Sequence, residues 1–152
     1  MIPNLYVLIG LPGSGKSTYA ETLMEKHPDA LYLSSDKIRE ELYGDESIQG
    51  NPQEVFGNLH HKMRKALGNN IDVIYDATNL SHKNRKKAVE IAKSANPTTI
   101  VHYIIIDTSL DECFRRNENR ERKVPENVIV RMSEQFNFPQ SDEGFSDIEI
   151  IK

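Results

Sequence analysis

The feature that most constrains the fold is a glycine-rich segment near the start of the chain. An apolar run at residues 5–9 (LYVLI) leads directly into residues 10–17 (GLPGSGKS), and a helical pattern follows over residues 16–27 until Pro28. The segment fits the pattern G-x-x-x-x-G-K-[ST], in which backbone N–H groups surround a phosphate. Glycine is needed there because a Cβ atom would block the close approach of the phosphate. The sequence therefore predicts a strand, a phosphate-binding loop (P-loop) and a helix in succession.

Defined positions of this P-loop are predicted to hold a nucleotide and a metal ion. Lys16 is expected to reach the β- and γ-phosphates, and the hydroxyl of Ser17 is expected to ligate Mg²⁺. The positive N-terminal end of the following helix points at the same phosphates. ATP or GTP together with Mg²⁺ is therefore the expected ligand.

Strand-like and helical patterns alternate along the rest of the chain. Strands are predicted at residues 5–9, 30–33, 71–75, 99–106 and 145–151, and helices at 16–27, 36–44, 51–68, 81–95, 109–119 and 125–138. Such alternation favours a parallel sheet that is covered on both faces by helices. Because the chain has 152 residues and no internal repeat, we expect a single α/β domain over residues 1–152.

Composition excludes several other classes of protein. Hydrophobic residues make up 38% of the chain, which is enough for a core, so a wholly disordered chain is excluded. The single cysteine, Cys113, excludes a disulfide framework and a cysteine-based zinc site. The N-terminus lacks a basic segment before its short apolar run, and no apolar run approaches the length of a membrane span. We therefore expect a cytoplasmic protein without a membrane partner.

The chain also lacks the motifs of two large classes of nucleotide hydrolases. It contains neither Asn-Lys-x-Asp nor Asp-x-x-Gly, which disfavours a Ras-like GTPase. The predicted strand ends at Asp76 and Asp107 are not followed by the glutamate that is typical of motor ATPases. Phosphoryl transfer to an acceptor is therefore the leading class of reaction.

Polar side chains follow the second and third predicted strands, where ligands bind in open α/β sheets. Asp36 and Arg39 are three residues apart and share a helix face, so the carboxylate could take a proton from a hydroxyl while the guanidinium orients a phosphate. Asp76, Thr78 and Asn79 follow the third strand and could reach the acceptor. A structural interpretation stays open for both groups. Asp36 could instead be a helix N-cap with a surface salt bridge to Arg39, and the later three residues could form a turn.

Two segments concentrate positive charge, although the formal net charge of the chain is −4. Residues 115–123 contain five basic and two acidic residues, with Arg116 and Arg120 on one face at a predicted helix end. As a lid, these arginines would neutralise charge on the transferred phosphoryl group; the alternative is a solvated charged face. Residues 82–93 contain five basic residues and one acidic residue, and either contact a nucleic-acid backbone or form an ordinary solvated helix.

Together, these motifs resemble the kinase domain of the 5′-hydroxyl polynucleotide kinases. The resemblance depends on residues 9–18, on Ser35-Asp36-x-x-Arg39, on residues 76–80 with Arg85 downstream, and on Arg116-Asn117-x-x-Arg120 before Val124-Pro125. It implies a three-layer P-loop NTPase fold with a parallel five-stranded sheet in the order 2-3-1-4-5. Helices would cover both faces, and a small Arg-rich lid would occupy about residues 115–124.

The resemblance also implies roles for individual residues. Asp36 would be the general base for an acceptor 5′-hydroxyl, and Arg39 would bind the acceptor phosphate or position the hydroxyl. The segment Phe138-Pro139-x-x-x-Glu143-Gly144-Phe145 resembles the family's region near the adenine. The implied catalytic residues are Lys16, Asp36, Arg39 and Arg120. The implied ATP-binding residues are Gly10, Gly13, Ser14, Gly15, Lys16, Ser17, Thr18, Arg116 and Arg120, with Ser17 as the metal ligand. The implied acceptor-binding residues are Asp36, Arg39, Asp76, Thr78, Asn79 and Arg85.

The sequence thus predicts an ATP-dependent kinase that transfers the γ-phosphoryl group to the 5′-hydroxyl of RNA or DNA, with ATP and Mg²⁺ as cofactors. Two alternatives stay open. One is a kinase whose acceptor is a nucleoside, a nucleotide or a sugar. The other is an ATP-binding regulatory module that transfers no phosphoryl group.

Overall fold

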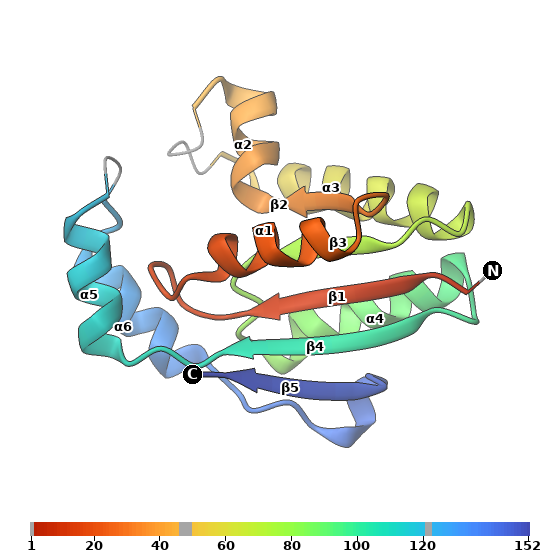
Figure 1. The fold of residues 1–152 in the computed structure, drawn as a ribbon. Helices are drawn as coiled ribbons and strands as arrows, with labels where there is room; N and C mark the ends of the chain where they lie inside the picture. Colours follow the sequence, from red (N-terminus) through yellow and green to blue (C-terminus); the bar gives the residue numbers. More distant parts are fainter. Residues whose placement is uncertain (1, 46–49, 121–122) are drawn as a thin grey trace.

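A five-stranded parallel sheet forms the centre of the protein (Figure 1). The computed structural model describes residues 2–45, 50–120 and 123–152. The strands are β1 (Asn4–Ile9), β2 (Leu31–Ser34), β3 (Val73–Asp76), β4 (Ile100–Ile106) and β5 (Asp147–Ile151). They lie in the order β2-β3-β1-β4-β5, and every neighbouring pair is parallel. The predicted α/β class and strand order are confirmed.

Helices cover both faces of this sheet. They are α1 (Lys16–Lys26), α2 (Ser35–Tyr43), α3 (Pro52–Gly68), α4 (His82–Ala95), α5 (Leu110–Glu118) and α6 (Glu126–Gln135). Figure 1 shows α1 on one face and α3 with α4 on the other, while α5 and α6 lie beyond the carboxyl ends of the strands. A short 3₁₀ helix, η1 (Ser141–Glu143), precedes β5 at a place where no helix is predicted from the sequence.

Alternating side chains of the central strand β1 anchor two hydrophobic cores. Leu5, Val7 and Ile9 are fully buried in the core beneath α3 and α4. Leu8 points to the opposite face, where it packs with Leu23 of α1. Burial on both faces fixes the register of the strand, because a shift by one residue would exchange the two sets of side chains. Packing of the two cores therefore fixes where β1 ends, and the P-loop begins, relative to the neighbouring strands β3 and β4.

The register of the sheet aligns the predicted functional segments along one edge. Asp76 at the end of β3 pairs with Leu8 of β1 on one side and with Ser34 of β2 on the other. Because all three strands run in the same direction, the segments that follow them leave the sheet side by side. The P-loop, Asp76 and the start of α2 are therefore neighbours in space.

Side-chain caps begin several of the helices. Asn51 accepts a hydrogen bond from the N–H of Gln53, and Pro52 is the first residue of α3, as predicted. Ser109 accepts from the N–H of Glu112 at the start of α5, but the Glu112 carboxylate pairs with two arginines and does not reach back to the cap. The spacing of Ser109 and Glu112 predicts a capping box, and only the bond to the serine hydroxyl is present.

Within the three stretches that the structure describes, no helix combines the length and the apolar character that crossing a lipid bilayer requires.

Candidate active site

A cleft of about 820 Å³ opens at the carboxyl edge of the sheet. Its lining comes from the P-loop, the start of α2, the segment after β3, and the segments around α5 and α6. From the predicted site residues, the cleft brings together Gly13, Gly15, Lys16, Ser17, Thr18, Asp36, Arg39, Asp76, Thr78, Arg116 and Arg120. Residues from four separate parts of the sequence therefore meet in one cavity.

The backbone of the P-loop has the shape of a cradle that only glycine permits. Gly13 and Gly15 have φ angles of 81° and 99°, in the left-handed region. A Cβ atom on Gly13 would lie 2.8 Å from the carbonyl oxygen of Cys113, and one on Gly15 would lie 3.0 Å from a guanidinium nitrogen of Arg116. The hydroxyl oxygen of Ser14 is buried and, among the described residues, has no hydrogen-bond partner. These features fit a phosphate, which would supply acceptors to the cradle.

Charged groups of both signs converge on Lys16. Burial lowers the pKa of its ammonium group, whereas the nearby carboxylates of Asp76 and Asp36 raise it and Arg120 lowers it further. The ammonium group donates to the carbonyl oxygen of Leu11 at 3.3 Å. Lys16 is thus a partly desolvated cation between two carboxylates, at the position where the P-loop pattern places a phosphate contact.

Ser17, the predicted metal ligand, lies beside Asp76 in one corner of the cleft. The hydroxyl of Ser17 donates to Oδ2 of Asp76 at 3.1 Å, and the hydroxyl of Tyr32 donates to the same oxygen. Burial and Asp76 raise the pKa of Tyr32, so this phenol stays a donor at neutral pH. The described residues contain no group of three or more His, Cys, Asp or Glu side chains placed to hold a metal ion. A hydroxyl and a carboxylate nevertheless fit Mg²⁺, which takes few protein ligands and completes its shell with phosphates and water.

Asp36 and Arg39 lie together in the first turns of α2. Oδ1 of Asp36 is 3.0 Å from a terminal nitrogen of Arg39, so the predicted ion pair is present. The N-cap interpretation of Asp36 is wrong, because Ser34 is the cap and accepts from the N–H of Lys37. The Asp36 side chain is 52% exposed, whereas Nε of Arg39 is buried and has no partner among the described residues. The pair therefore leaves a carboxylate open to the cleft and a guanidinium with an unused donor.

The predicted lid contributes two arginines at and just after the end of α5. Arg116 donates through one nitrogen to the carbonyl oxygen of Ser14 at 2.9 Å and through Nε to Glu112 at 3.0 Å. Arg120 lines the cleft one residue beyond the helix cap at Asn119. Residues 121–122 of the predicted lid lie outside the described part of the chain. One lid arginine thus already contacts the P-loop.

Four predicted site residues do not line the cleft. The backbone N–H of Gly10 donates a hydrogen bond to the carbonyl oxygen of Thr78 at 3.1 Å. The side chain of Ser14 is buried. Asn79 is 4% exposed, and its amide donates to the carbonyl oxygen of Leu8 at 2.8 Å. These three residues shape the cleft from beneath its surface.

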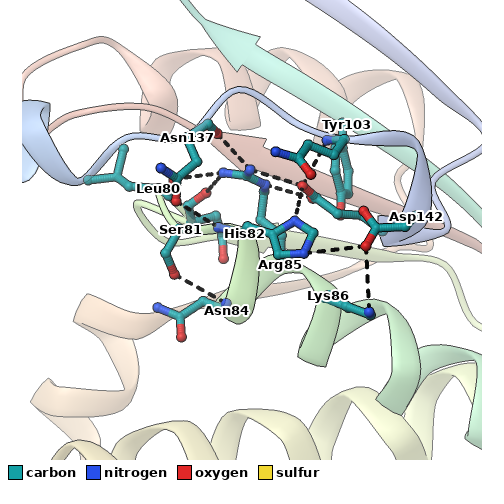
Figure 2. Close-up of polar contacts among 12 residues, drawn as sticks. Leu80, Ser81, His82, Asn84, Arg85, Lys86, Tyr103, Asn137 and Asp142 are labelled. Atoms are coloured by element: carbon teal, nitrogen blue, oxygen red, sulfur yellow. Dashed lines mark hydrogen bonds and ion pairs between the residues drawn. The ribbon is translucent and has the colours of Figure 1, made fainter.

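Arg85 is the largest departure from the prediction. It is fully buried on α4 and pairs with Glu143, with Nε and Oε1 2.8 Å apart (Figure 2). The prediction that Arg85 binds the acceptor is therefore wrong, because its donors are used inside the protein. The place of the segment at residues 138–145 near the adenine stays a prediction, and within it Glu143 is buried and paired with Arg85.

The cleft also has an apolar wall that was not predicted. Phe56 of α3, Val128 and Met132 of α6 and Pro125 face the same cavity. An adjoining hollow of about 420 Å³ shares Thr78 and Met132 with the cleft, and its other lining residues are Leu80, Ser81, Asn84 and Gln135. Val128 and Met132 are four residues apart in the sequence, and this helical spacing was the available signal for a shared face. The contribution of Phe56 had no local signal.

Comparison with known proteins identifies the family. Residues 5–139 match the family AAA_33, described as an AAA domain, and the chain belongs to this family of P-loop kinases. The L-seryl-tRNA(Sec) kinase of Methanococcus maripaludis is 31% identical over 140 residues, which are 89% of this chain and 53% of that protein. The putative bifunctional polynucleotide kinase/RNA ligase of Autographa californica nuclear polyhedrosis virus is 29% identical over 136 residues, 82% of this chain and 19% of that protein. The chain thus spans about half the length of the first relative and a fifth of the second.

A solved structure supports the same fold. Kti12 of Chaetomium thermophilum in complex with ADP-AlF3 superposes with a TM-score of 0.78 at 20% identity. The match covers 97% of this chain and 88% of that one. At this level of identity the likeness shows the fold alone, whereas the match to the AAA_33 family confirms the predicted resemblance to P-loop kinases.

Proposed function

We propose that this AAA_33 P-loop kinase transfers the γ-phosphoryl group of ATP to the 5′-hydroxyl of a nucleic acid, and that residues 1–152 form one kinase unit with a lid at about residues 115–124. The observation that carries the proposal is the ion pair of Asp36 and Arg39, which lines the same cleft as Lys16. A carboxylate that is open to the cleft can take a proton, and the arginine beside it can bind an anion. The pair thus offers a proton acceptor and an anion-binding group to a hydroxyl that has a phosphate nearby.

The donor half of the site holds the triphosphate of ATP. The P-loop surrounds the phosphates with backbone N–H groups, and Lys16, Arg116 and Arg120 supply positive charge where negative charge develops on the transferred group. Ser17 and Asp76 would hold Mg²⁺. When bound, this ion neutralises phosphate charge and orients the phosphate oxygens.

The acceptor half activates the hydroxyl. As the hydroxyl oxygen attacks the γ-phosphorus, Asp36 takes the hydroxyl proton. The bond between the γ-phosphorus and the oxygen that bridges it to the β-phosphate breaks, and ADP leaves with that electron pair. Arg39 lines the cleft, and its guanidinium group holds the nearest phosphate of the acceptor. This role favours an acceptor that carries its own phosphate, as a 5′-hydroxyl polynucleotide does at its first linkage.

The lining of the cleft supports an acceptor larger than a sugar. The apolar wall of Phe56, Val128 and Met132 offers a surface for a base or a ribose, and the adjoining hollow has no charged residue in its lining. The names of two relatives, a seryl-tRNA kinase and a polynucleotide kinase/RNA ligase, both refer to nucleic-acid acceptors. The size and the chemistry of the cleft agree with such acceptors.

A transfer assay with γ-labelled ATP tests the proposal. The panel contains 5′-hydroxyl RNA and DNA oligomers, the same oligomers with a 5′-phosphate, nucleosides, mononucleotides and sugars. We expect label on the 5′-hydroxyl oligomers and none on their phosphorylated counterparts. Label on small acceptors alone would replace the proposal with a small-molecule kinase. Tight ATP binding with no labelled product would replace it with a regulatory module.

A further inference from the structure

Outside the cleft, the buried side chain of Arg85 forms a dense network of hydrogen bonds (Figure 2). Its Nε and one terminal nitrogen reach the two carboxylate oxygens of Glu143 at 2.8 and 3.1 Å. Its other bonds go to the backbone carbonyl oxygens of Asn79 at 3.0 Å, Leu80 at 2.7 Å and Asn137 at 2.6 Å. A guanidinium group has five N–H donors, so these five bonds use all of them.

Glu143 is fixed as firmly as its partner. It is 2% exposed and accepts from the hydroxyl of Tyr103 at 2.9 Å and from the backbone N–H of Gln140 at 2.9 Å. A ring nitrogen of His82 lies 2.9 Å from its Oε2. With both charges neutralised and every strong donor of Arg85 used, the arginine has a fixed position in the interior.

Two of the carbonyl groups that Arg85 holds belong to the segment at residues 77–80, which we call the 77–80 loop. This loop follows β3, and its Thr78 lines both the cleft and the adjoining hollow. On its other side, the carbonyl oxygen of Thr78 accepts from the N–H of Gly10, and the Asn79 amide donates to Leu8. The loop is therefore held between the beginning of the P-loop and the buried arginine.

We propose that Arg85, oriented by Glu143, is a positioning residue that places the 77–80 loop, and Thr78 with it, for binding of the acceptor. The kinetic half of this inference rests on the proposed function, because it requires an acceptor. Arg85 holds the loop by two consecutive carbonyl groups on its buried side. A substitution of Arg85 therefore displaces Thr78, although no residue that lines the cleft is substituted. Asp76 stays in place because it is paired within the sheet to Leu8 and Ser34.

The variant Arg85→Lys separates positioning from charge. Lysine keeps the positive charge opposite Glu143 but lacks the planar fork that reaches two backbone carbonyls and a carboxylate together. We expect the KM for a 5′-hydroxyl oligomer to rise ~10-fold or more, because a displacement of about 1 Å in a binding surface has effects of this size or larger. The KM for ATP and the kcat at saturating acceptor should change by less than about twofold, since the donor side and Asp36 keep their supports.

Tyr103→Phe is the matched control. It removes one hydrogen bond from the same buried network, to Glu143, but touches neither carbonyl group of the 77–80 loop. We expect this variant to lower the thermal midpoint while leaving the KM for the acceptor unchanged. If Tyr103→Phe and Arg85→Lys raise that KM equally, or if Arg85→Lys raises the KM values for ATP and acceptor together, the role of Arg85 is structural and the inference is overturned.

A second measurement does not depend on activity. The backbone N–H groups of Gly10 and Asn137 donate to the carbonyl oxygens of Thr78 and Leu80, so their hydrogen exchange reports how well the loop is held. In Arg85→Lys these two amides should exchange ~10-fold faster or more, while amides within β1 and β4 keep their rates. Unchanged exchange at both amides overturns the inference even if kinetics differ. If the wild-type protein labels no acceptor, the proposed function fails, and hydrogen exchange alone then decides the inference.

Discussion

The ends of the neighbouring strands β2 and β3 carry the same kinds of residue and use them in opposite ways. After β2, Asp36 and Arg39 pair with each other at the cleft and keep a carboxylate exposed to it. After β3, Asp76 faces the cleft, but Arg85 turns into the protein and pairs with Glu143. An acid followed by an arginine thus forms a reactive surface in one place and an internal support in the other.

The difference between the two arginines lies in the partner that each one finds. Arg39 has a partner three residues away on its own helix, so its ion pair forms at the surface of α2. Arg85 and its partner Glu143 are 58 residues apart in the sequence, and the carboxylate arrives from the segment before β5. Arg39 thus pairs within its own helix and lies beside the cleft, whereas Arg85 pairs with a carboxylate distant in the sequence and lies in the interior.

The strongest test of this contrast between the ends of β2 and β3 is removal of the exposed carboxylate of Asp36, for which we expect the largest loss of activity. Asp36→Asn should lower kcat by ~10²–10⁴-fold, because the amide cannot take the proton of the hydroxyl. Binding of ATP and the thermal midpoint should change little, since the side chain is half-exposed. Single-turnover kinetics and a melting curve measure the two effects, and Glu40→Gln on the same helix is the control. Full activity of Asp36→Asn would remove Asp36 from the role of base.

The paired variants Arg85→Met and Arg39→Met compare the two arginines directly. Arg85→Met leaves Glu143 buried without its partner and should lower the free energy of unfolding by about 3–5 kcal/mol. Arg39→Met removes a partly exposed pair and should change that free energy by only about 1 kcal/mol or less. It should instead raise the KM for the acceptor ~10–100-fold, through loss of a charged hydrogen bond. Denaturant unfolding and acceptor kinetics separate these outcomes, and equal losses of stability would contradict the contrast.

Acid should lower the free energy of unfolding, because protonation of Glu143 weakens its ion pair with Arg85. Burial by itself raises the pKa of this carboxyl group, but hydrogen bonds from Arg85, the Gln140 amide and His82 outweigh burial and lower the pKa to about 2. Because the folded pKa lies below the unfolded value, the stabilisation is complete above about pH 5 and is lost as the pH falls toward 2. Its size is about 3 kcal/mol. Unfolding measured across this range should show a shallower dependence on pH in Glu143→Gln, and an unaltered dependence would exclude Glu143 as its source.

The smallest expected effect concerns the surface charge of α4. Arg85 does not contribute to this surface, because it is buried. Lys83 and Lys87 remain exposed on this helix. If they contact an acceptor backbone, Lys83→Gln combined with Lys87→Gln should weaken binding of an RNA oligomer and reduce the salt slope by about one for each lysine. We expect instead a change in acceptor KM of less than about twofold, as for a solvated helix face. Acceptor kinetics at several salt concentrations distinguish the two results.

The sequence predicts the fold and the strand, P-loop and helix at its start well, because both follow from local patterns, whereas the ATP-binding roles of individual residues stay predictions. The P-loop spacing and the apolar run before it specify a strand, a turn and a helix within about 20 residues. The N-cap at Asn51 is similarly local. The acceptor half depends on tertiary packing, and here the prediction fails at Asn79 and Arg85.

A signal for the burial of Arg85 was nevertheless present in the sequence. Ala88, Val89 and Ala92 follow Arg85 at three, four and seven residues, which is the spacing of a buried helix face. An arginine in that phase needs an internal carboxylate, but no pattern in the sequence identifies Glu143 as that carboxylate. The contacts of Tyr32 with Asp76 and the position of Phe56 in the cleft likewise depend on pairings that only the folded chain creates.

The separation of Arg85 from Glu143 also has a consequence for the order of folding during synthesis. The carboxylate that neutralises Arg85 joins the growing chain 58 residues after it, shortly before β5 completes the sheet beside β4. Until then, the face of α4 that must pack against the sheet carries an uncompensated cation, which opposes its burial. We therefore expect α4 to complete its packing against the sheet only after the segment that carries Glu143 has been synthesised.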